Sequence, residues 1–347
     1  MKQFIKKSIG ILAMFVLFVM GLAKGQNVQF SQYYNLIQYQ NPAFVGTALA
    51  GRAMVHNRLQ WPGLESKYTT SVASVDYNLG KYQSGLGAML VYDNQGSSTI
   101  QSYQGIFQYA YQIVVTENAR LRAGANIGLT SRTLHNADLY YPDQFNGSGF
   151  SNDPNVPQYT KNYLDLGAGL LYYTPKFWAG VSAMHLNNPN QSFVGDRERV
   201  PVKFDFLTGY KFILRTNPTM RYIEREDETV WALYPTVLYK WQEKSDQLDV
   251  GFYSIYDIFK IGLWYRGLPI KNYNGQLINN EAFIVLAGIK LGNFTVNYSY
   301  DFTLSKLNTY SQGAHELNLT FLFPKAKGKT YKYKTLPCPE FYGFKNE

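Results

Sequence analysis

The residues able to do acid–base, nucleophilic or metal chemistry are few and scattered along this chain. The four histidines, at positions 56, 135, 185 and 315, show neither the H-E-x-x-H nor the H-x-x-H spacing that brings two imidazoles to one metal ion. Cys338 is the only cysteine, so the chain can form neither an internal disulfide nor a cysteine metal site. We therefore predict no metal and no cofactor.

Two stretches resemble catalytic motifs only superficially. Gly85 and Gly87 lie inside an apolar run without a strand–helix boundary, which favours close packing in a strand over a phosphate-binding loop. The stretch GVSAM at 180–184 lacks the second glycine of a nucleophile elbow. No serine–histidine spacing suggests a hydrolase, and we predict that the protein is not an enzyme.

The C-terminal stretch 324–347 has a marked character of its own, because lysines alternate with aromatic residues before Leu336-Pro337-Cys338-Pro339. The prolines prevent a further strand. The stretch is either a solvated tail or a peptide that docks on a partner, with charge for steering and aromatic rings as anchors. The candidate docking residues are Lys329, Tyr331, Tyr333, Phe341 and Tyr342.

The N-terminal stretch 1–25 has the layout of a secretory signal peptide, with Lys2, Lys6 and Lys7 before an apolar core and Ala23-Lys24-Gly25 as a cleavage site. We expect the mature chain to start at Gln26; the alternative is an uncleaved anchor. Several of the lysines behind the net charge of +9 lie in this segment, so the remaining surplus does not suggest a nucleic-acid partner.

The elements that must position any site are strands. In 294–308 and 313–323, apolar or aromatic residues alternate with polar ones over about ten residues. Such a pattern fits a soluble sheet with a wet outer face, or a membrane barrel with a wet interior.

The rest of the chain favours the barrel. Aromatic residues make up 16% of the chain, as many as the charged residues, whereas globular domains carry about 25% charged residues. A soluble sandwich would have more charged and less aromatic outer faces. The polar faces carry both signs of charge, as in a hydrated or salt-bridged lumen. The predicted strands are 51–61, 67–80, 83–96, 98–116, 119–135, 163–175, 176–189, 201–214, 229–242, 245–258, 259–270, 279–292, 294–308 and 313–323.

These strands predict an all-β fold, a transmembrane antiparallel β-barrel of about 14 strands. The predicted organisation is a signal peptide (1–25), an N-terminal plug or lumenal segment (26–50), the barrel (51–323) and a periplasmic basic and aromatic tail (324–347). The plug is expected as a short helix or irregular segment inside or beneath the sheet.

The connections alternate in length, which predicts an orientation. The tight turns at 80–83, 116–119, 174–176 and 292–294 would face the periplasm, and the longer 136–162, 189–200 and 270–279 would face outward. The long charged segment 215–228 is the exception, since this topology places it on the periplasmic side. Both chain termini are expected there.

The segment VQFSQYYNLIQYQNPAFVGT (28–47) resembles the mature N-terminus of the PorP/SprF family of the type IX secretion system. The stretches at 234–241, 261–267, 297–307 and 313–321 are similar to its middle and last strands. The resemblance covers roughly 28–323. The residues that carry the N-terminal motif are Phe30, Ser31, Gln32, Tyr33, Asn41, Pro42, Ala43 and Gly46.

The resemblance implies an outer-membrane protein of Bacteroidota, similar in architecture to the long-chain fatty-acid transporter barrels, with a part in protein secretion and gliding motility. The partners it implies are outer-membrane lipid, a secreted surface adhesin with a type IX sorting domain, and periplasmic secretion components. It leaves open whether the chain is a general component or is dedicated to one cargo.

Three hypotheses follow. The first is a non-enzymatic barrel that anchors or helps to export an adhesin, with its outer loops toward cargo and with 215–228 and 324–347 toward the periplasmic machinery. The second is an outer-membrane channel for hydrophobic or small polar solutes. The third, a hydrolase, has no candidate residues.

Overall fold

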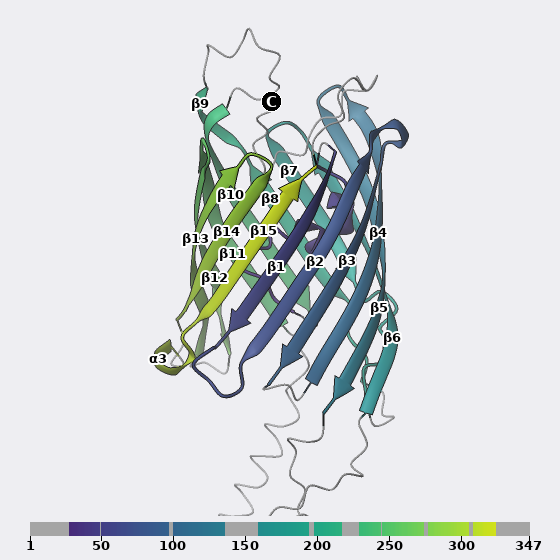
Figure 1. Ribbon diagram of the computed structural model, residues 1–347, viewed down its shortest axis with the longest axis vertical. Coiled ribbons are helices and arrows are strands. Elements are labelled where there is room, and N and C mark those ends of the chain that lie inside the picture. The colour runs from purple at the N-terminus through teal and green to yellow at the C-terminus, as the bar shows by residue number, and fades with distance from the viewer. Residues whose placement is uncertain are drawn as a thin grey trace, which may run out of the picture.

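A computed structural model describes residues 28–48, 50–96, 100–135, 159–193, 198–216, 229–243, 245–273, 277–304 and 308–323. These residues form one antiparallel sheet that closes on itself (Figure 1). The predicted signal peptide and tail lie outside them and stay predictions. The strands are β1 Gly51–Gln60, β2 Tyr68–Leu79, β3 Ser84–Gln95, β4 Ile100–Thr116, β5 Ala119–Leu134, β6 Tyr159–Tyr173, β7 Phe177–Met184, β8 Lys203–Tyr210, β9 Phe212–Thr216, β10 Thr229–Gln242, β11 Ser245–Tyr256, β12 Phe259–Tyr273, β13 Leu277–Leu291, β14 Phe294–Thr303 and β15 Ala314–Leu322.

The sheet closes because the first and last strands pair. Gln60 of β1 lies opposite Ala314 of β15, and Arg52 lies opposite Leu322. Around the rest of the wall each strand pairs with its neighbours in sequence. The segments β8 and β9 both pair with β10 and are separated at Lys211, so they form one interrupted strand in a barrel of 14 strands. The predicted fold is confirmed.

Some predicted strand ends differ from the structure. The strand predicted at 176–189 ends at Met184, because His185 (φ 61°) and Asn188 (φ 43°) adopt left-handed conformations that turn the chain away. The strand predicted at 294–308 ends at Thr303. In the other direction, the strand predicted at 163–175 begins earlier, at Tyr159, and the one predicted at 201–214 continues to Thr216 through β9.

The distribution of side chains is the reverse of that in a soluble protein, with apolar residues outside and charged residues inside. Leu90 is 67% exposed and Val55 is 55% exposed, whereas Arg52 and Glu316 are buried. The alternation predicted for the last two strands is confirmed: Tyr298 and Leu317 point outward, and their polar neighbours point inward. Burying charge and exposing apolar surface is stable where the surroundings are lipid and the interior is polar.

Exposed aromatic side chains lie toward both ends of the barrel. Tyr77, Phe259 and Phe294 stand near one end of their strands, while Tyr103, Trp241 and Phe302 stand near the other. Tyrosine, tryptophan and phenylalanine gather in this way at the two interfaces of a membrane barrel.

The two ends of the barrel carry different connections. One end, here called the turn end, carries the short connections after β2, β4, β6, β11 and β13, together with Phe323. It is the upper end in Figure 1. The long connection after β9 is an exception at this end. The other end, here called the loop end, carries the connections after β1, β3, β5, β7, β10, β12 and β14, of which the one after β10 is short, and the short helix α3 (Asn308–Ser311). The turns predicted to share one end do share it.

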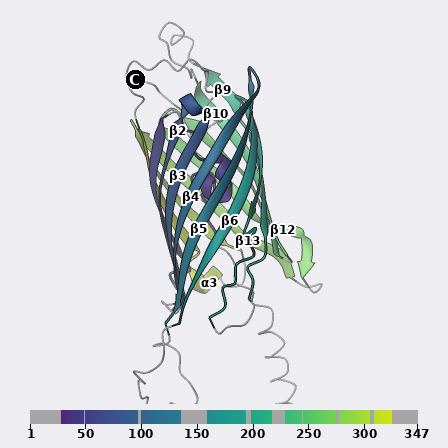
Figure 2. The same cartoon turned by 90° about the vertical axis from the view of Figure 1, so that its right-hand side faces the viewer.

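Residues 28–48 lie inside the barrel, where Figure 2 shows short helices at mid-height behind the wall. All residues from Phe30 to Ala48 are buried except Tyr39, which is half-buried. The segment contains α2 (Ile37–Gln40) and the 3-10 helix η1 (Pro42–Phe44); a second 3-10 helix, η2 (Gly80–Tyr82), lies in the turn after β2. We call residues 28–48 the plug. In the part of the chain that the structure describes, no helix is long and apolar enough to cross a membrane.

Candidate functional site

The start of the plug is held by one buried carboxylate of the wall. Glu316 on β15 accepts the backbone N–H of Ser31 (2.7 Å) on one oxygen and that of Gln32 (2.8 Å) on the other. The Gln32 side chain also donates to Ser299 Oγ (3.0 Å) and to the Glu316 carbonyl (3.1 Å). The plug is therefore joined to the two last strands through charge-assisted hydrogen bonds, which are stronger than neutral ones.

Glu316 belongs to a network of buried ion pairs that crosses the lumen side of five strands, β1, β11, β12, β14 and β15. Arg58 on β1 pairs with Glu316 and with Asp301 (3.0 Å), and Ser31 Oγ donates to the same Asp301. Arg266 on β12 pairs with Asp249 (2.7 Å) and reaches Asp301 (3.4 Å). We call Arg58, Asp249, Arg266, Asp301 and Glu316 the charge network. Each carboxylate of the network faces a guanidinium, which offsets the cost of burying its charge.

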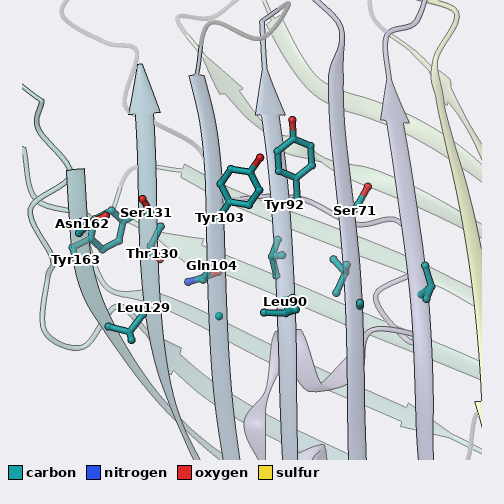
Figure 3. A pocket seen from close by; sticks show the side chains of 15 residues that line it. Ser71, Leu90, Tyr92, Tyr103, Gln104, Leu129, Thr130, Ser131, Asn162 and Tyr163 are labelled. Carbon is teal, nitrogen blue, oxygen red and sulfur yellow. The ribbon is translucent and has the colours of Figure 1, made fainter. Parts of the chain in front are cut away.

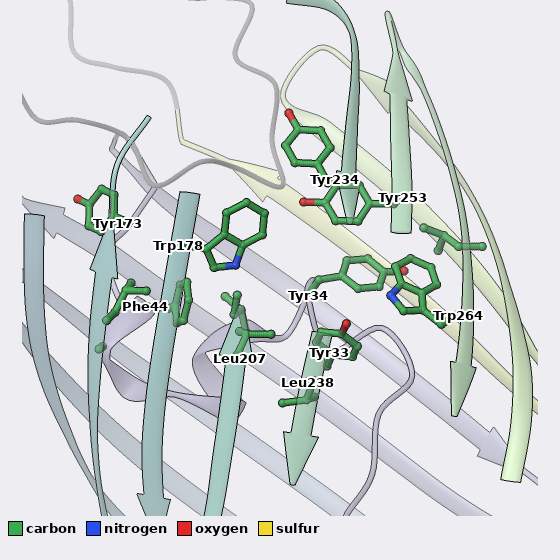
Figure 4. Close-up of a cluster of buried hydrophobic side chains, with 14 of the residues drawn as sticks. Tyr33, Tyr34, Phe44, Tyr173, Trp178, Leu207, Tyr234, Leu238, Tyr253 and Trp264 are labelled. Carbon is green, nitrogen blue, oxygen red and sulfur yellow. The ribbon is translucent and has the colours of Figure 1, made fainter. Parts of the chain in front are cut away.

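The next residues of the plug pack against aromatic side chains of the wall (Figure 4). Tyr34 stacks on Trp264, with ring centroids 4.6 Å apart and planes 9° apart, and Lys260 Nζ lies 4.8 Å above the Tyr34 ring. The hydroxyl of Tyr33 is 2.9 Å from Thr236 Oγ1, and burial raises the pKa of Tyr33 above its ordinary value. The lumen is thus partly aromatic, and a neutral tyrosine suits it.

The Asn41-Pro42-Ala43 stretch forms a turn that is bonded to the wall. Asn41 Oδ1 accepts the N–H of Ala43 (2.9 Å) and caps η1, while Pro42 occupies the first position of that helix. Asn41 Nδ2 donates to the carbonyls of Leu170 (3.0 Å) and Val181 (3.2 Å) on β6 and β7. One asparagine therefore shapes the turn and attaches it.

The wall includes glycines where this turn and the residues after it approach most closely. A Cβ at Gly124 would overlap the backbone of Pro42 and Ala43, and one at Gly85 would overlap the Val45 carbonyl. Gly85 and Gly87 thus serve the close packing that the sequence predicted, with the plug as the packed partner. Only residues without a side chain let the plug backbone approach this closely.

The end of the plug is held by two arginines and an aspartate. Arg122 donates to the carbonyls of Ala43 (2.8 Å) and Val45. Gly46 adopts φ +67° and donates its N–H to Asp76 (2.7 Å), which in turn pairs with Arg52 (2.6 Å). Gly46 supplies the left-handed conformation at little cost.

The structure thus brings the N-terminal motif residues together as the contact residues of the plug. Phe30 packs edge-on against Tyr39 and His56, with ring centroids 5.2 Å apart in both pairs. The candidate docking residues of the tail (Lys329, Tyr331, Tyr333, Phe341 and Tyr342) lie outside the described residues.

Sequence reasoning missed most of the wall residues that bind the plug. In β1, outward residues alternate with Arg52, His56 and Arg58, and this spacing could have predicted a charged inner face. Their pairing with Asp76, Asp301 and Glu316 was not readable, because it depends on which strands are neighbours. Among the described residues, no three histidine, cysteine, aspartate or glutamate side chains gather so as to hold a metal ion.

A shallow apolar groove of about 630 Å³ lies on the outer face across β1–β6 (Figure 3). Its lining includes Val55, Leu90, Tyr103 and Leu129, all of which point away from the lumen. The rings of Tyr92 and Tyr103 lie 4.9 Å apart above it. Its position on the membrane-facing surface suits acyl chains rather than a soluble ligand.

A family model described as type IX secretion system membrane protein PorP/SprF matches residues 22–321. No curated protein matches the chain. Among solved structures, the Pseudomonas putida toluene transporter TodX is 9% identical, with a TM-score of 0.46 over 82% of this chain and 92% of that one. The monoaromatic hydrocarbon channel CymD is 13% identical (TM-score 0.45; 86% and 94% covered). The outer membrane protein Omp33 of Acinetobacter baumannii is 10% identical (TM-score 0.44; 80% and 100% covered).

Proposed function

Because the chain belongs to the PorP/SprF family of type IX secretion system membrane proteins, we propose that it acts as a non-catalytic barrel that anchors or helps to export a surface adhesin. The family and the barrel fold identify an outer-membrane component of type IX secretion. The adhesin would carry a type IX sorting domain, and the proposal includes a part in gliding motility in a bacterium of the Bacteroidota.

The observation that carries this proposal is the attachment of the plug. Residues 30–48 are bonded to the wall at both ends, through Glu316 at the start and through Arg122 and Asp76 at the end. A barrel whose interior is occupied by its own chain is suited to holding partners at its rims. This supports anchoring over the alternative, a channel for hydrophobic or small polar solutes.

We propose that the turn end faces the periplasm, since outer-membrane barrels have short periplasmic turns and longer outer loops. In this orientation the segments 136–162 and 189–200 would meet the adhesin, and 215–228 and 324–347 would meet periplasmic secretion components. The chain leaves β15 at the turn end, so the tail would start on the periplasmic side. Val28 and Gln29, by contrast, lie in the lumen beside Lys203, Gln242 and Ser245, toward the loop end.

The anchoring role is tested by deleting the gene and measuring every surface adhesin by its accessibility to added protease on intact cells. We expect at least one adhesin to be lost from the surface and to return with the full chain. Complementation with a chain that ends at Phe323 tests the tail separately. Normal display of every adhesin in the deletion strain would contradict the proposal.

Planar bilayers test the alternative. The purified barrel should show little steady conductance, and cells that carry it should take up fatty acids no faster than cells without it. Steady conductance of the unaltered protein would favour the channel.

A further inference from the structure

The segment β9 has a hydrogen-bonding edge that no described strand covers. Along β8 the wall is complete, with Phe177 of β7 opposite Tyr210. The last bond across this seam joins the Lys211 N–H to the Lys176 carbonyl (2.6 Å). Beyond it β7 gives way to the turn at 174–176, while β9 continues along β10 on its other side as far as Thr216.

The side chains of β9 are exposed on both faces, unlike those of the wall strands. Phe212 is 49% exposed, Ile213 is 39% exposed and Leu214 is 50% exposed. Phe212 and Ile213 pair in regular register with Leu233 and Ala232 of β10 and so point to opposite faces, while Leu214 lies at a register shift before Arg215. Apolar groups therefore stand on both sides of this edge. An edge strand with no neighbour presents unpaired backbone groups and is a template for another extended chain.

The charges along this edge have one sign. Three basic residues flank it: Lys176 in the neighbouring turn, and Lys211 and Arg215 at the two ends of the apolar run. Neither β9 nor the turn at 174–176 contains an acidic residue. Lys176 and Arg215 are exposed. A chain that adds to this edge would therefore be favoured by carboxylates that meet these side chains.

We propose that β9 binds an extended, acidic segment of a partner protein by β-strand addition, with the backbone of Phe212–Thr216 supplying the hydrogen bonds. In this mode the main chain gives affinity, and alternate side chains give specificity. Apolar residues of the partner would cover the exposed side chains of Phe212, Ile213 and Leu214. The identity of the partner as a secretion component rests on the proposed function; the binding mode does not.

Two other occupants are disfavoured by charge. The basic tail at 324–347 would bring lysines against Lys176 and Arg215, and a second copy would bring the same basic rim against itself. Like charges placed opposite each other disfavour pairing of strands.

The binding mode is tested with the full-length protein in detergent, carrying a photoreactive phenylalanine at position 214. The matched control carries it at position 294, where Phe294 is also exposed at the turn end, but on a strand that is paired on both sides. The probes are a peptide of alternating valine and glutamate, the same peptide with lysine for glutamate, and the glutamate peptide with a central proline.

We expect the glutamate peptide to cross-link at position 214 roughly tenfold more than the lysine peptide, since the rim attracts one and repels the other. The proline peptide should lose most of the cross-link, because proline cannot donate to a ladder. Position 294 should not distinguish the probes, and Arg215→Glu should reduce the preference for glutamate.

Equal cross-linking by all three probes, or equal yields at positions 214 and 294, would overturn the proposal. A cross-linked dimer at position 214 without peptide would assign the edge to a second copy. Much stronger peptide binding after truncation at Phe323 would assign it to the tail. These results do not depend on adhesin display, so failure of the proposed function would be seen separately.

Discussion

At the scale of single residues, the plug depends on carboxylates that are shared between its backbone and the arginines of the wall. Glu316 accepts two backbone N–H groups from the plug and also pairs with Arg58. Removing one partner of a buried ion pair costs more than the pair contributes, because a buried charge is left alone. Substitutions in the charge network should therefore be costly.

The first prediction concerns Glu316→Ala. The substitution leaves Asp301 as the one carboxylate paired with Arg58 and removes the acceptor of two buried N–H groups, so we expect a loss of about 3–5 kcal/mol of stability. Denaturant unfolding in detergent, followed by tryptophan fluorescence, measures this loss. The control is Glu117→Ala in the exposed turn after β4, which should unfold as the unaltered protein does. Equal midpoints for the two variants would contradict the shared role of Glu316.

The second prediction concerns Gly124, one of the wall glycines on which the plug packs. In Gly124→Ala the new Cβ overlaps the backbone of Ala43, so we expect a destabilisation of about 1–3 kcal/mol from overpacking. The matched control is Gly105→Ala on β4, whose Cβ would meet only Leu90, at 3.8 Å. Unfolding midpoints of the two variants are compared, and a cost at Gly105 as large as that at Gly124 would count against the close approach.

At the scale of elements, the plug and the wall are complementary in shape and charge. The turn at Asn41-Pro42-Ala43 meets glycines on β5 and β6, and Asn41 bonds to carbonyls of β6 and β7. The start of the plug meets β14 and β15. The plug therefore joins β5–β7 to β14 and β15, on the opposite side of the barrel.

The third prediction is that removal of residues 28–48 opens the lumen. The variant should insert as a barrel but conduct ions in planar bilayers, since the segment that fills the interior is gone. The unaltered protein is the reference. Identical conductance from both proteins would mean that the plug does not control passage. A variant that fails to insert is recognised by loss of the folded band on unheated gels.

At the scale of the whole molecule, the outward apolar surface and the inward charge specify a membrane as the surrounding medium. The apolar band includes Val55, Leu90 and Leu319, and aromatic side chains stand toward both ends. In water, a substitution of an exposed leucine by arginine costs little, whereas in a bilayer it is costly.

The fourth prediction uses this difference. Leu90→Arg, on the outer face of β3, should destabilise the barrel by about 2–4 kcal/mol in lipid vesicles, because arginine near the bilayer midplane is unfavourable. Tyr82→Arg is the control, since Tyr82 is as exposed (64%) but lies in the turn after β2. If both variants unfold alike in lipid, Leu90 does not face the membrane core.

The sequence by itself determined the barrel, because an alternation with period two is a local property that each strand carries independently of its neighbours. It also identified the plug motif from Phe30 to Gly46 through a family resemblance. Only the tertiary structure decided what these residues do. Arg58, Asp301 and Glu316 are far apart in the chain, and they meet because β1 pairs with β15 and β15 with β14.

The inward aromatic residues make the same point. Trp264 alternates in phase with Lys260 and Arg266, so the pattern places its ring inward. The stacking of Trp264 and Tyr253 on Tyr34 of the plug is seen only in the structure. Composition cannot distinguish a ring that meets lipid from one that meets the plug, since both surroundings are apolar. The closed sheet and the segment inside it decide what each inward ring packs against.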